Sequence, residues 1–261
     1  MIAIVLLFVL IVLVLVIQNQ SPVIPKGLKC YVISLESDHQ NRLSWFKKNY
    51  EASDARHVLP LEVIPAVDGR ALGDEVLEKT LSRRAWQEIR DAETTGFRKG
   101  HYQLTRGAVG CYLSHLKVLE RIAASRDPGG IVFEDDSKVP RNFCKKFTTS
   151  VYDLREKAMD MLLFGCVCMK CNPGRTRKVS RFFQTHGYYV TREGAQKILN
   201  ILSGAQIEQQ IDSALSDLCE TGDLEVFCAK PSFVHQGTFK TTIQLPVPKK
   251  YSATIRRPTG P

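Results

Sequence analysis

Short apolar runs that alternate with amphipathic segments are the feature that most constrains the fold of this chain. Residues 30–35 (CYVISL) and 61–67 (LEVIPAV) are continuous apolar runs rich in β-branched residues, the pattern of strands buried on both faces of a parallel sheet. The segment between them, residues 39–52, is amphipathic and predicts a helix. A strand, a helix and a second strand form a βαβ unit, so the chain opens as an α/β protein.

The same alternation continues to the end of the chain. Further strands are predicted at residues 131–133, 161–165, 182–190 and 224–229, and further helices at residues 107–123, 192–202 and 207–219. Residues 71–106 are polar and charged and predict a surface insertion. We therefore expect one α/β domain with a mostly parallel central sheet.

The 261 residues carry a formal net charge of +9, but the basic residues are dispersed. They occur at residues 83–84, at 175–181 and between 240 and 257. A solvated surface accounts for this distribution, and a polyanionic partner such as anionic lipid, nucleotide phosphate or nucleic acid is the alternative. Because no nucleic-acid-binding motif is visible, we predict no nucleic-acid partner.

Residues 2–17 form an unbroken apolar run at the N-terminus. As a helix this run spans about 24 Å, short of a hydrocarbon core of roughly 30 Å but enough for a thin bilayer. No charged segment precedes it and no small-x-small cleavage site follows, so a single-pass anchor is favoured over a cleaved signal peptide. The positive-inside rule, applied to Lys26 and Lys29, would keep the domain in the cytosol, so the orientation stays open.

These features divide the chain into four parts. The predicted boundaries are 1–17 for the membrane anchor or signal segment, 18–28 for a stalk, 29–239 for the α/β domain and 240–261 for a basic C-terminal tail. The stalk contains two prolines and a glycine, which disfavour regular structure.

The chain has eight cysteines, an even number that permits disulfides. Cys166, Cys168 and Cys171 form a CxCxxC cluster that could bind zinc with His186 as a fourth ligand. Because this spacing matches no standard structural zinc site, a disulfide or buried thiols are favoured.

Three adjacent carboxylates, Glu134, Asp135 and Asp136, follow the apolar run at residues 131–133. At the carboxyl end of a parallel strand they lie where α/β proteins bind ligands, and a polyvalent cation or a set of donors would relieve their repulsion. A nucleotide-sugar transferase, an aspartyl phosphatase or a plain charged turn could carry such a cluster. The phosphatase is disfavoured because its first position would be Glu134 where aspartate is expected.

Five segments that include this cluster occur in a recognisable order. They are YVISLESDHQNR, GAVGCYLSHLKVLERI, IVFEDDS, THGYYVTREGAQKIL and QIDSAL. Together they resemble glycosyltransferase family 25, which includes lipopolysaccharide-type galactosyltransferases and collagen hydroxylysine galactosyltransferases. The resemblance covers about residues 29–239, which would be the glycosyltransferase domain.

The resemblance implies a GT-A-like nucleotide-diphospho-sugar transferase fold with a donor-binding half and an acceptor-binding half. It implies inverting, metal-dependent transfer of a hexose, galactose or glucose, from a UDP-sugar to a glycan or a collagen-like hydroxylysine acceptor. The domain would then lie in the lumen of the ER or Golgi, with the cytosolic face as the alternative. An inactive transferase-like module that binds glycan or a cation is the competing function.

The resemblance also suggests roles for individual residues. Mn²⁺ or Mg²⁺ would be bound by Asp136, Asp135 and His235, with Glu134 or Asp135 reaching the ribose or a bound water; a surface histidine is the alternative for His235. Asp212 would be the catalytic base, although it could simply cap a helix.

The other assignments are less specific. His115 is a second catalytic candidate, although a histidine on a largely apolar helix is more often a core residue. The donor-binding candidates are Ser34, Arg42, Ser114 and Lys117, and the substrate-binding candidates are His186, Gly187 and Tyr188. Tyr188 could equally belong to the core.

Overall fold

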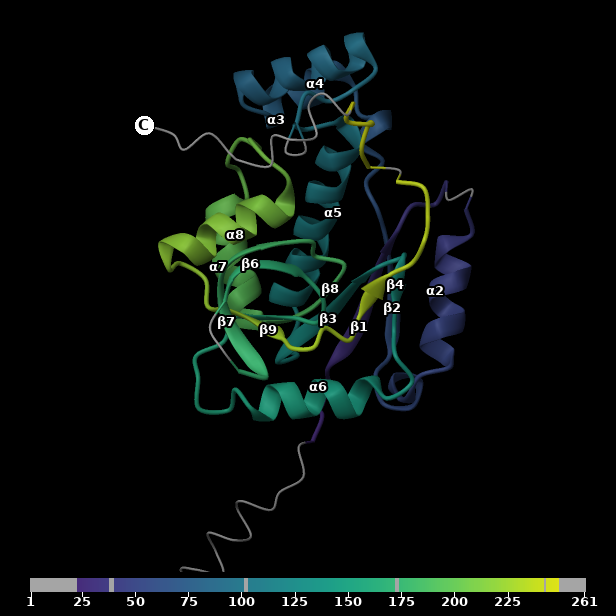
Figure 1. The fold of residues 1–261 in the computed structure, drawn as a ribbon, viewed down its shortest axis with the longest axis vertical. Coiled ribbons are helices and arrows are strands. Elements are labelled where there is room, and N and C mark those ends of the chain that lie inside the picture. Colours follow the sequence, from purple (N-terminus) through teal and green to yellow (C-terminus); the bar gives the residue numbers. More distant parts are fainter. Residues whose placement is uncertain (1–22, 38–39, 101–102, 172–173, 242, 249–261) are drawn as a thin grey trace, which may run out of the picture.

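An eight-stranded mixed sheet forms the centre of the molecule (Figure 1). The computed structural model describes residues 23–37, 40–100, 103–171, 174–241 and 243–248. The strands are β1 (Lys29–Ser34), β2 (Leu61–Pro65), β3 (Gly129–Glu134), β5 (Met161–Leu163), β6 (Val167–Cys171), β7 (Thr176–Phe183), β8 (Gly187–Thr191) and β9 (Val226–Ala229). Their order in the sheet is β2-β1-β3-β8-β5-β9-β7-β6.

Six of the eight strands run in one direction. β1 is parallel to β2 and β3, and β5 is parallel to β9, whereas β8 is antiparallel to β3 and β5, and β7 is antiparallel to β9 and β6. Only β7 and β8 are therefore reversed, and the predicted mostly parallel α/β sheet is confirmed. A separate two-stranded antiparallel sheet joins β4 (Ser137–Lys138) to β10 (His235–Gln236).

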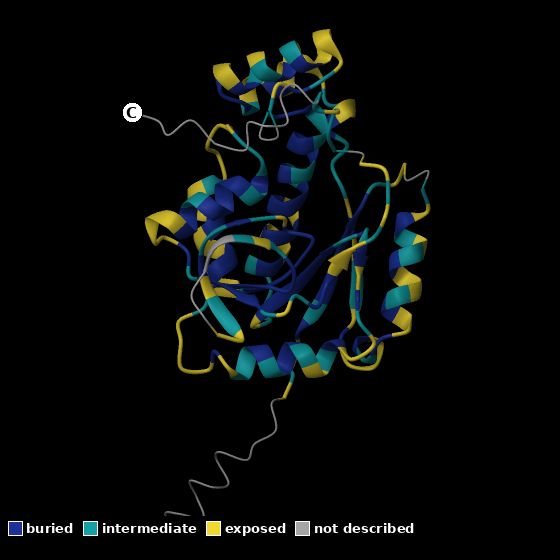
Figure 2. Ribbon diagram, viewed as in Figure 1, coloured by how far each residue is buried: buried dark blue, intermediate teal, exposed yellow. Residues whose placement is uncertain are grey.

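Helices cover both faces of the large sheet. The elements are α2 (Arg42–Glu51), α3 (Asp74–Thr80), α4 (Arg83–Thr95), α5 (Arg106–Ala123), α6 (Phe143–Tyr152), α7 (Arg192–Leu202) and α8 (Ile211–Thr221), with short 3-10 turns η1 (Asp54–His57) and η2 (Gly69–Ala71). Side chains alternate along β1, so that Tyr31 and Ile33 join the core under α5, α7 and α8, while Cys30 and Val32 join the core under α2 and α6. Figure 2 shows the buried sheet between helices whose outer faces are exposed.

Some predicted segments differ from the structure, and the helix predicted at 207–219 is α8, which begins only at Ile211. The single strand predicted at 182–190 is wrong, because Gln184 has a left-handed φ of 73° and the chain divides there into β7 and β8. Residues 71–106 are more ordered than a surface insertion, since they contain α3 and α4. Helix α4 is capped by Ser82, whose hydroxyl accepts a hydrogen bond from Ala85 N, and it buries Ile89 in the core.

The predicted anchor at 1–17 and most of the stalk lie outside the described residues. Within the part of the chain that the structure describes, no helix combines the length and apolar character needed to cross a bilayer. The zinc alternative gains no support, because His186 Nε2 lies 3.1 Å from Val234 O inside the core and the side chain of Cys171 is outside the described set.

Candidate active site

The candidate site lies at the carboxyl edge of β1, β2 and β3. These three strands are parallel, and their register pairs Ser34 with Pro65 and Ile33 with Glu134, so all three end at the same level. Asp135 and Asp136 follow directly after β3. The structure thus places the acidic cluster at the mouth of a buried strand, beside the end of β1.

Asp135 is held by two partners. Ser34 Oγ donates to Asp135 Oδ2 over 2.8 Å, and Arg42 Nε lies 2.9 Å from Asp135 Oδ1. All three side chains are buried. Both of its oxygens are therefore engaged within the protein, and the metal-binding role of Asp135 stays a prediction.

Asp136 has one engaged oxygen and one open oxygen. Arg42 donates to Asp136 Oδ2 over 2.6 Å, whereas Asp136 Oδ1 is buried and has no hydrogen-bond partner among the described residues. Burial raises the pKa of Asp136 to about 7, and the neighbouring Glu134 charge adds to this while Arg42 opposes it. The open oxygen therefore lies where a cation would stabilise its charged form.

Glu134 connects the site to the core. His115 Nε2 lies 3.7 Å from Glu134 Oε1, and His115 Nδ1 lies 3.0 Å from the hydroxyl of Tyr188. Burial alone would raise the pKa of Glu134, but the nearby His115, His186 and Arg42 side chains lower it overall. His115 and Tyr188 are both buried, so Glu134 is connected through His115 to the hydrophobic core.

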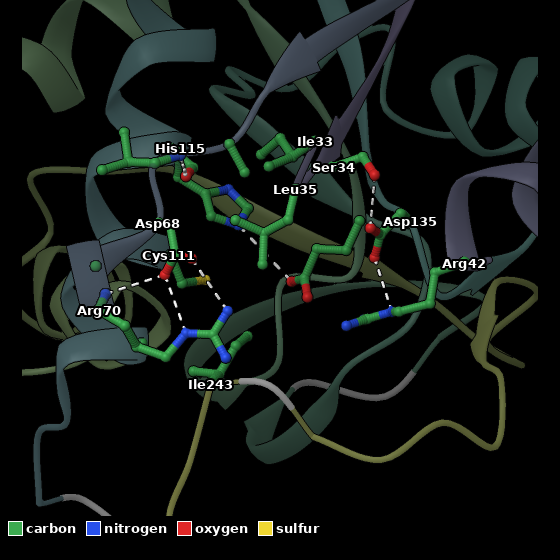
Figure 3. Close-up of a pocket in the computed structure, with 16 residues that line it drawn as sticks. Ile33, Ser34, Leu35, Arg42, Asp68, Arg70, Cys111, His115, Asp135 and Ile243 are labelled. Atoms are coloured by element: carbon green, nitrogen blue, oxygen red, sulfur yellow. Dashed lines mark hydrogen bonds and ion pairs between the residues drawn. The ribbon is translucent and has the colours of Figure 1, made fainter. Parts of the chain in front are cut away.

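A first cavity, of about 60 Å³, opens beside this cluster (Figure 3). It is formed by the end of β1, the turn after β2, the middle of α5 and the end of β3. The polar residues that line it are Ser34, Arg42, Asp68, Arg70, Ser114, His115, Glu134 and Asp135. Figure 3 shows Ser34, Asp135 and Arg42 along one wall, with Asp68 and Arg70 on the opposite side.

The turn after β2 and helix α5 touch through glycines. A side chain at Gly110 would meet Val67 O at 2.4 Å, and one at Gly69 would meet Arg106 O at 1.8 Å. Ser114 Oγ accepts a hydrogen bond of 2.8 Å from Val67 N. The small residues of the GAVGCYLSH segment therefore dock α5 against the wall of the first cavity.

A second cavity, of about 320 Å³, adjoins the first. The ionisable residues that line it are Arg42, Cys111, Glu134, Asp136, Asp212 and Lys240. The remaining polar residues of its wall are Gln184, Thr185, Gln210, Gln236, Thr241 and Gln244. Three carboxylates from β3, its following turn and α8 thus converge on one space.

Asp212 lies in the first turn of α8 and faces the second cavity. Its Oδ2 accepts from Gln184 N over 3.0 Å and its Oδ1 accepts from Ser213 N over 2.8 Å. Burial raises the pKa of Asp212 despite these two hydrogen bonds. A partly buried carboxylate with a raised pKa is a stronger base than an ordinary aspartate, which suits it to accept a proton.

Five of the predicted site residues lie outside the walls of both cavities. Lys117 is exposed on α5, where its Nζ donates to Pro65 O over 2.9 Å, and His235 is exposed in β10. Neither lines the two cavities, whereas Gln236, the next residue, lines the second. His186, Gly187 and Tyr188 are buried and also lie outside both cavity walls, so the structure does not place them against a ligand in either space.

Residues from three late segments line the second cavity and were not predicted from the sequence. Gln184 and Thr185 come from the turn between β7 and β8, Gln210 precedes α8, and residues 236–241 and 243–244 belong to a segment assigned in part to the tail. Cys111 lines both cavities and was also missed. Cys111 precedes Ser114 by three residues in the GAVGCYLSH segment, and this spacing could have indicated that the two share a helix face.

A divalent cation fits one position in this site. Asp136 Oδ1 is a buried carboxylate oxygen that lacks a partner among the described residues, and Glu134 lines the same cavity. In the described residues no group of three or more His, Cys, Asp or Glu side chains is arranged to hold a metal. Mg²⁺ is commonly held by one or two carboxylates together with substrate phosphates, which is the arrangement that Asp136 and Glu134 could provide.

Comparison with known proteins identifies the class of this chain as a glycosyltransferase. A family model described as "Glycosyltransferase family 25 (LPS biosynthesis protein)" matches residues 28–215. The chain therefore belongs to glycosyltransferase family 25, as its motifs indicated.

Among its relatives, human "Procollagen galactosyltransferase 2" is 23% identical and "Procollagen galactosyltransferase 1-A" of Xenopus laevis is 30% identical. The alignments cover 78% and 49% of this chain, but 34% and 23% of those relatives. Mouse "Inactive glycosyltransferase 25 family member 3" is 30% identical over 52% of this chain and 21% of its own length. The chain thus spans a third or less of the length of most of these relatives.

A solved structure of apo UDP-glucose pyrophosphorylase also aligns with this chain. The TM-score is 0.40 at 10% identity, and the alignment covers 77% of this chain and 90% of that one. At that score we draw no argument from the likeness.

Proposed function

We propose that this chain is a metal-dependent, inverting glycosyltransferase that moves galactose or glucose from a UDP-sugar to a glycan or a hydroxylysine-type protein acceptor. The observation that carries the proposal is the convergence of Glu134, Asp136 and Asp212 on one cavity at the carboxyl edge of the sheet. Membership of family 25 and the names of the procollagen galactosyltransferase relatives support the reaction and the acceptor class. A GT-A-like arrangement is part of the same proposal.

The two cavities would bind different parts of the substrates. The first cavity, bounded by Ser34, Asp68 and Ser114, would take the nucleoside of the donor. The second cavity would take the transferred sugar and the acceptor hydroxyl. Asp136 lines the second cavity and accepts a hydrogen bond from Arg42, which lines both cavities. The diphosphate would then lie between the nucleoside in the first cavity and the proposed catalytic base, Asp212, in the second.

Each acid has a distinct part in this scheme. Asp136 and Glu134 would hold Mn²⁺ or Mg²⁺, and a cation bound there would offset the charge of the departing diphosphate. Asp212 would accept the proton of the acceptor hydroxyl as its oxygen attacks the anomeric carbon, opposite the leaving group. Asp135 would position Arg42 and Ser34 without touching the substrate.

A screen of common UDP-sugars with Mn²⁺, scored by UDP release, tests the proposal. We expect release from UDP-galactose or UDP-glucose, stimulated by a hydroxylysine or glycan acceptor and abolished by excess EDTA. Release that continues undiminished in EDTA would contradict the role of Asp136.

An inactive module that binds glycan or a cation is the second candidate. Arg42 already neutralises part of the acidic cluster, and one relative is named as inactive. Binding of UDP with no release from any donor would favour this candidate.

We further propose that residues 2–17 anchor the chain in a membrane as a single pass, with the domain in the lumen of the ER or Golgi. The unbroken apolar run supports the anchor, and the secretory setting follows from the proposed collagen-like or glycan acceptor. Protease protection of the domain in sealed microsomes would support this orientation, and digestion without detergent would place the domain on the cytosolic face.

A further inference from the structure

The segment after β10 is part of the domain rather than a free tail. We call residues 237–241 and 243–246 the C-terminal strap. The Gln40 amide forms two hydrogen bonds of 3.0 Å with the backbone of Lys240, accepting from its N–H and donating to its carbonyl. The Phe239 ring packs edge-on against Trp45 at 5.2 Å and lies 5.6 Å from the Arg42 guanidinium. The strap is therefore fixed next to the acidic cluster.

The other end of the strap is fixed as well. Arg98 N donates to Pro246 O over 2.9 Å, and Arg98 Nε donates to Leu245 O over 2.8 Å. Thr105, the N-cap residue of α5, donates its hydroxyl to Ile243 O. With both ends tied to the domain, the strap crosses the cavities, and Ile243 lines both of them.

Lys240 is an exposed lysine in the wall of the second cavity. It lines that cavity together with Glu134, Asp136 and Asp212. The other cation of this wall, Arg42, is engaged by Asp135 and Asp136. Lys240, in contrast, forms no ion pair with any described residue.

Arg70 is not equivalent to Lys240. It lines the first cavity, where its guanidinium pairs with both oxygens of Asp68 at 3.0 and 3.1 Å. Recruiting Arg70 to a phosphate would leave Asp68 without that partner. Lys240 can meet an anion without breaking an ion pair in the described structure.

We propose that Lys240 contacts the diphosphate of the bound donor, an inference that rests on the proposed function. A diphosphate that enters a space lined by three carboxylates requires positive charge, and a lysine ammonium is a common phosphate-binding group. The Gln40 clamp fixes the Lys240 backbone before the ligand arrives, which lowers the entropy lost on binding. The C-terminal strap is thus a component of the donor site.

Titration calorimetry of the full chain with UDP and with uridine, each in the presence of Mn²⁺, tests this contact. Lys240→Gln should weaken UDP binding roughly tenfold, the loss of one charge-assisted contact, and leave uridine binding within about twofold. Lys240→Arg should retain most UDP affinity because it keeps the charge. Lys47→Gln, the same change on the exposed face of α2, is the matched control and should bind both ligands as the wild type does.

The outcomes separate this inference from the proposed function. If the wild type binds UDP and Lys240→Gln binds it equally well, the inference fails and the proposed function stands. Equal loss of UDP and uridine affinity would also overturn it, because the effect would not come from the phosphates. A wild type that binds neither ligand would overturn the proposed function and this inference together.

Discussion

The first and second cavities share four lining residues, Arg42, Cys111, Glu134 and Ile243, but they are built in different ways. The first is formed mostly by the ends of consecutive parallel strands and by α5. The second is formed by a turn between reversed strands, the start of α8 and the C-terminal strap. The half of the sheet formed by β1, β2 and β3 thus carries the proposed nucleoside site, and segments distant in sequence complete the proposed reaction site.

This difference predicts different kinetic consequences. Changes in the first cavity should act mainly on donor affinity. Changes in the second should act mainly on turnover, except at Lys240, which would meet the donor there. The following substitutions test that division, beginning with the largest expected effect.

Asp212→Asn should lower kcat roughly 10²- to 10⁴-fold and leave the KM for the donor nearly unchanged, because it removes the proposed base. Since burial raises the pKa of Asp212, the acid limb of the wild-type kcat profile should lie above the pH expected for an ordinary aspartate. Steady-state UDP release across pH measures both effects. Asp217→Asn on the same helix is the control. If Asp212→Asn changed only KM, the second cavity would not act on turnover as proposed.

Asp136→Asn should lower UDP release roughly a thousandfold at saturating Mn²⁺, because a cation stabilises the leaving diphosphate by several kcal/mol. The variant should also lose most of the stimulation by metal that the wild type shows. Asp153→Asn, an exposed residue after α6, provides a control with the same change in charge. Normal, metal-stimulated release by Asp136→Asn would place the cation elsewhere.

Arg42→Gln should lower the free energy of unfolding by about 3 kcal/mol, because it leaves the buried Asp135 and the partly buried Asp136 without their cation. Urea denaturation measures this loss. Arg84→Gln removes an exposed arginine on α4 and should change stability by less than about 0.5 kcal/mol. Equal stability of the two variants would show that Arg42 does not hold the acidic cluster together.

His235→Ala should have the smallest effect, within about twofold of wild-type UDP release, because an exposed side chain outside both cavities is usually neutral to substitution. Gln236→Ala should lower release more than His235→Ala does, since Gln236 lines the second cavity. A loss of metal-dependent activity in His235→Ala alone would restore the role that the sequence suggested for this histidine.

The sequence predicted the parts of the site that depend on local pattern. The βαβ opening, the mostly parallel sheet and the acids after β3 follow from periodicity and from where parallel strands end. Ser34 and Arg42 were assigned to the donor by resemblance, and the structure joins both to Asp135. The Ser34 contact joins the ends of the neighbouring strands β1 and β3, and Arg42 reaches Asp135 from the start of α2.

The parts that could not be predicted depend on contacts between distant residues. Gln40 and Lys240 are 200 positions apart, and no periodic pattern connects them. The left-handed φ of Gln184, which ends β7, carries no glycine signal in the sequence. The sequence left Tyr188 open between a substrate-binding and a core position, and the structure buries it with its hydroxyl 3.0 Å from His115 Nδ1.

The most direct test of the central claim is a crystal structure with UDP and Mn²⁺, in which anomalous scattering locates the manganese. The account predicts one manganese next to the Asp136 carboxylate, with the uridine in the first cavity and the diphosphate between Asp136 and Lys240. Manganese and UDP density at a site remote from the carboxyl edge of β3 would contradict it.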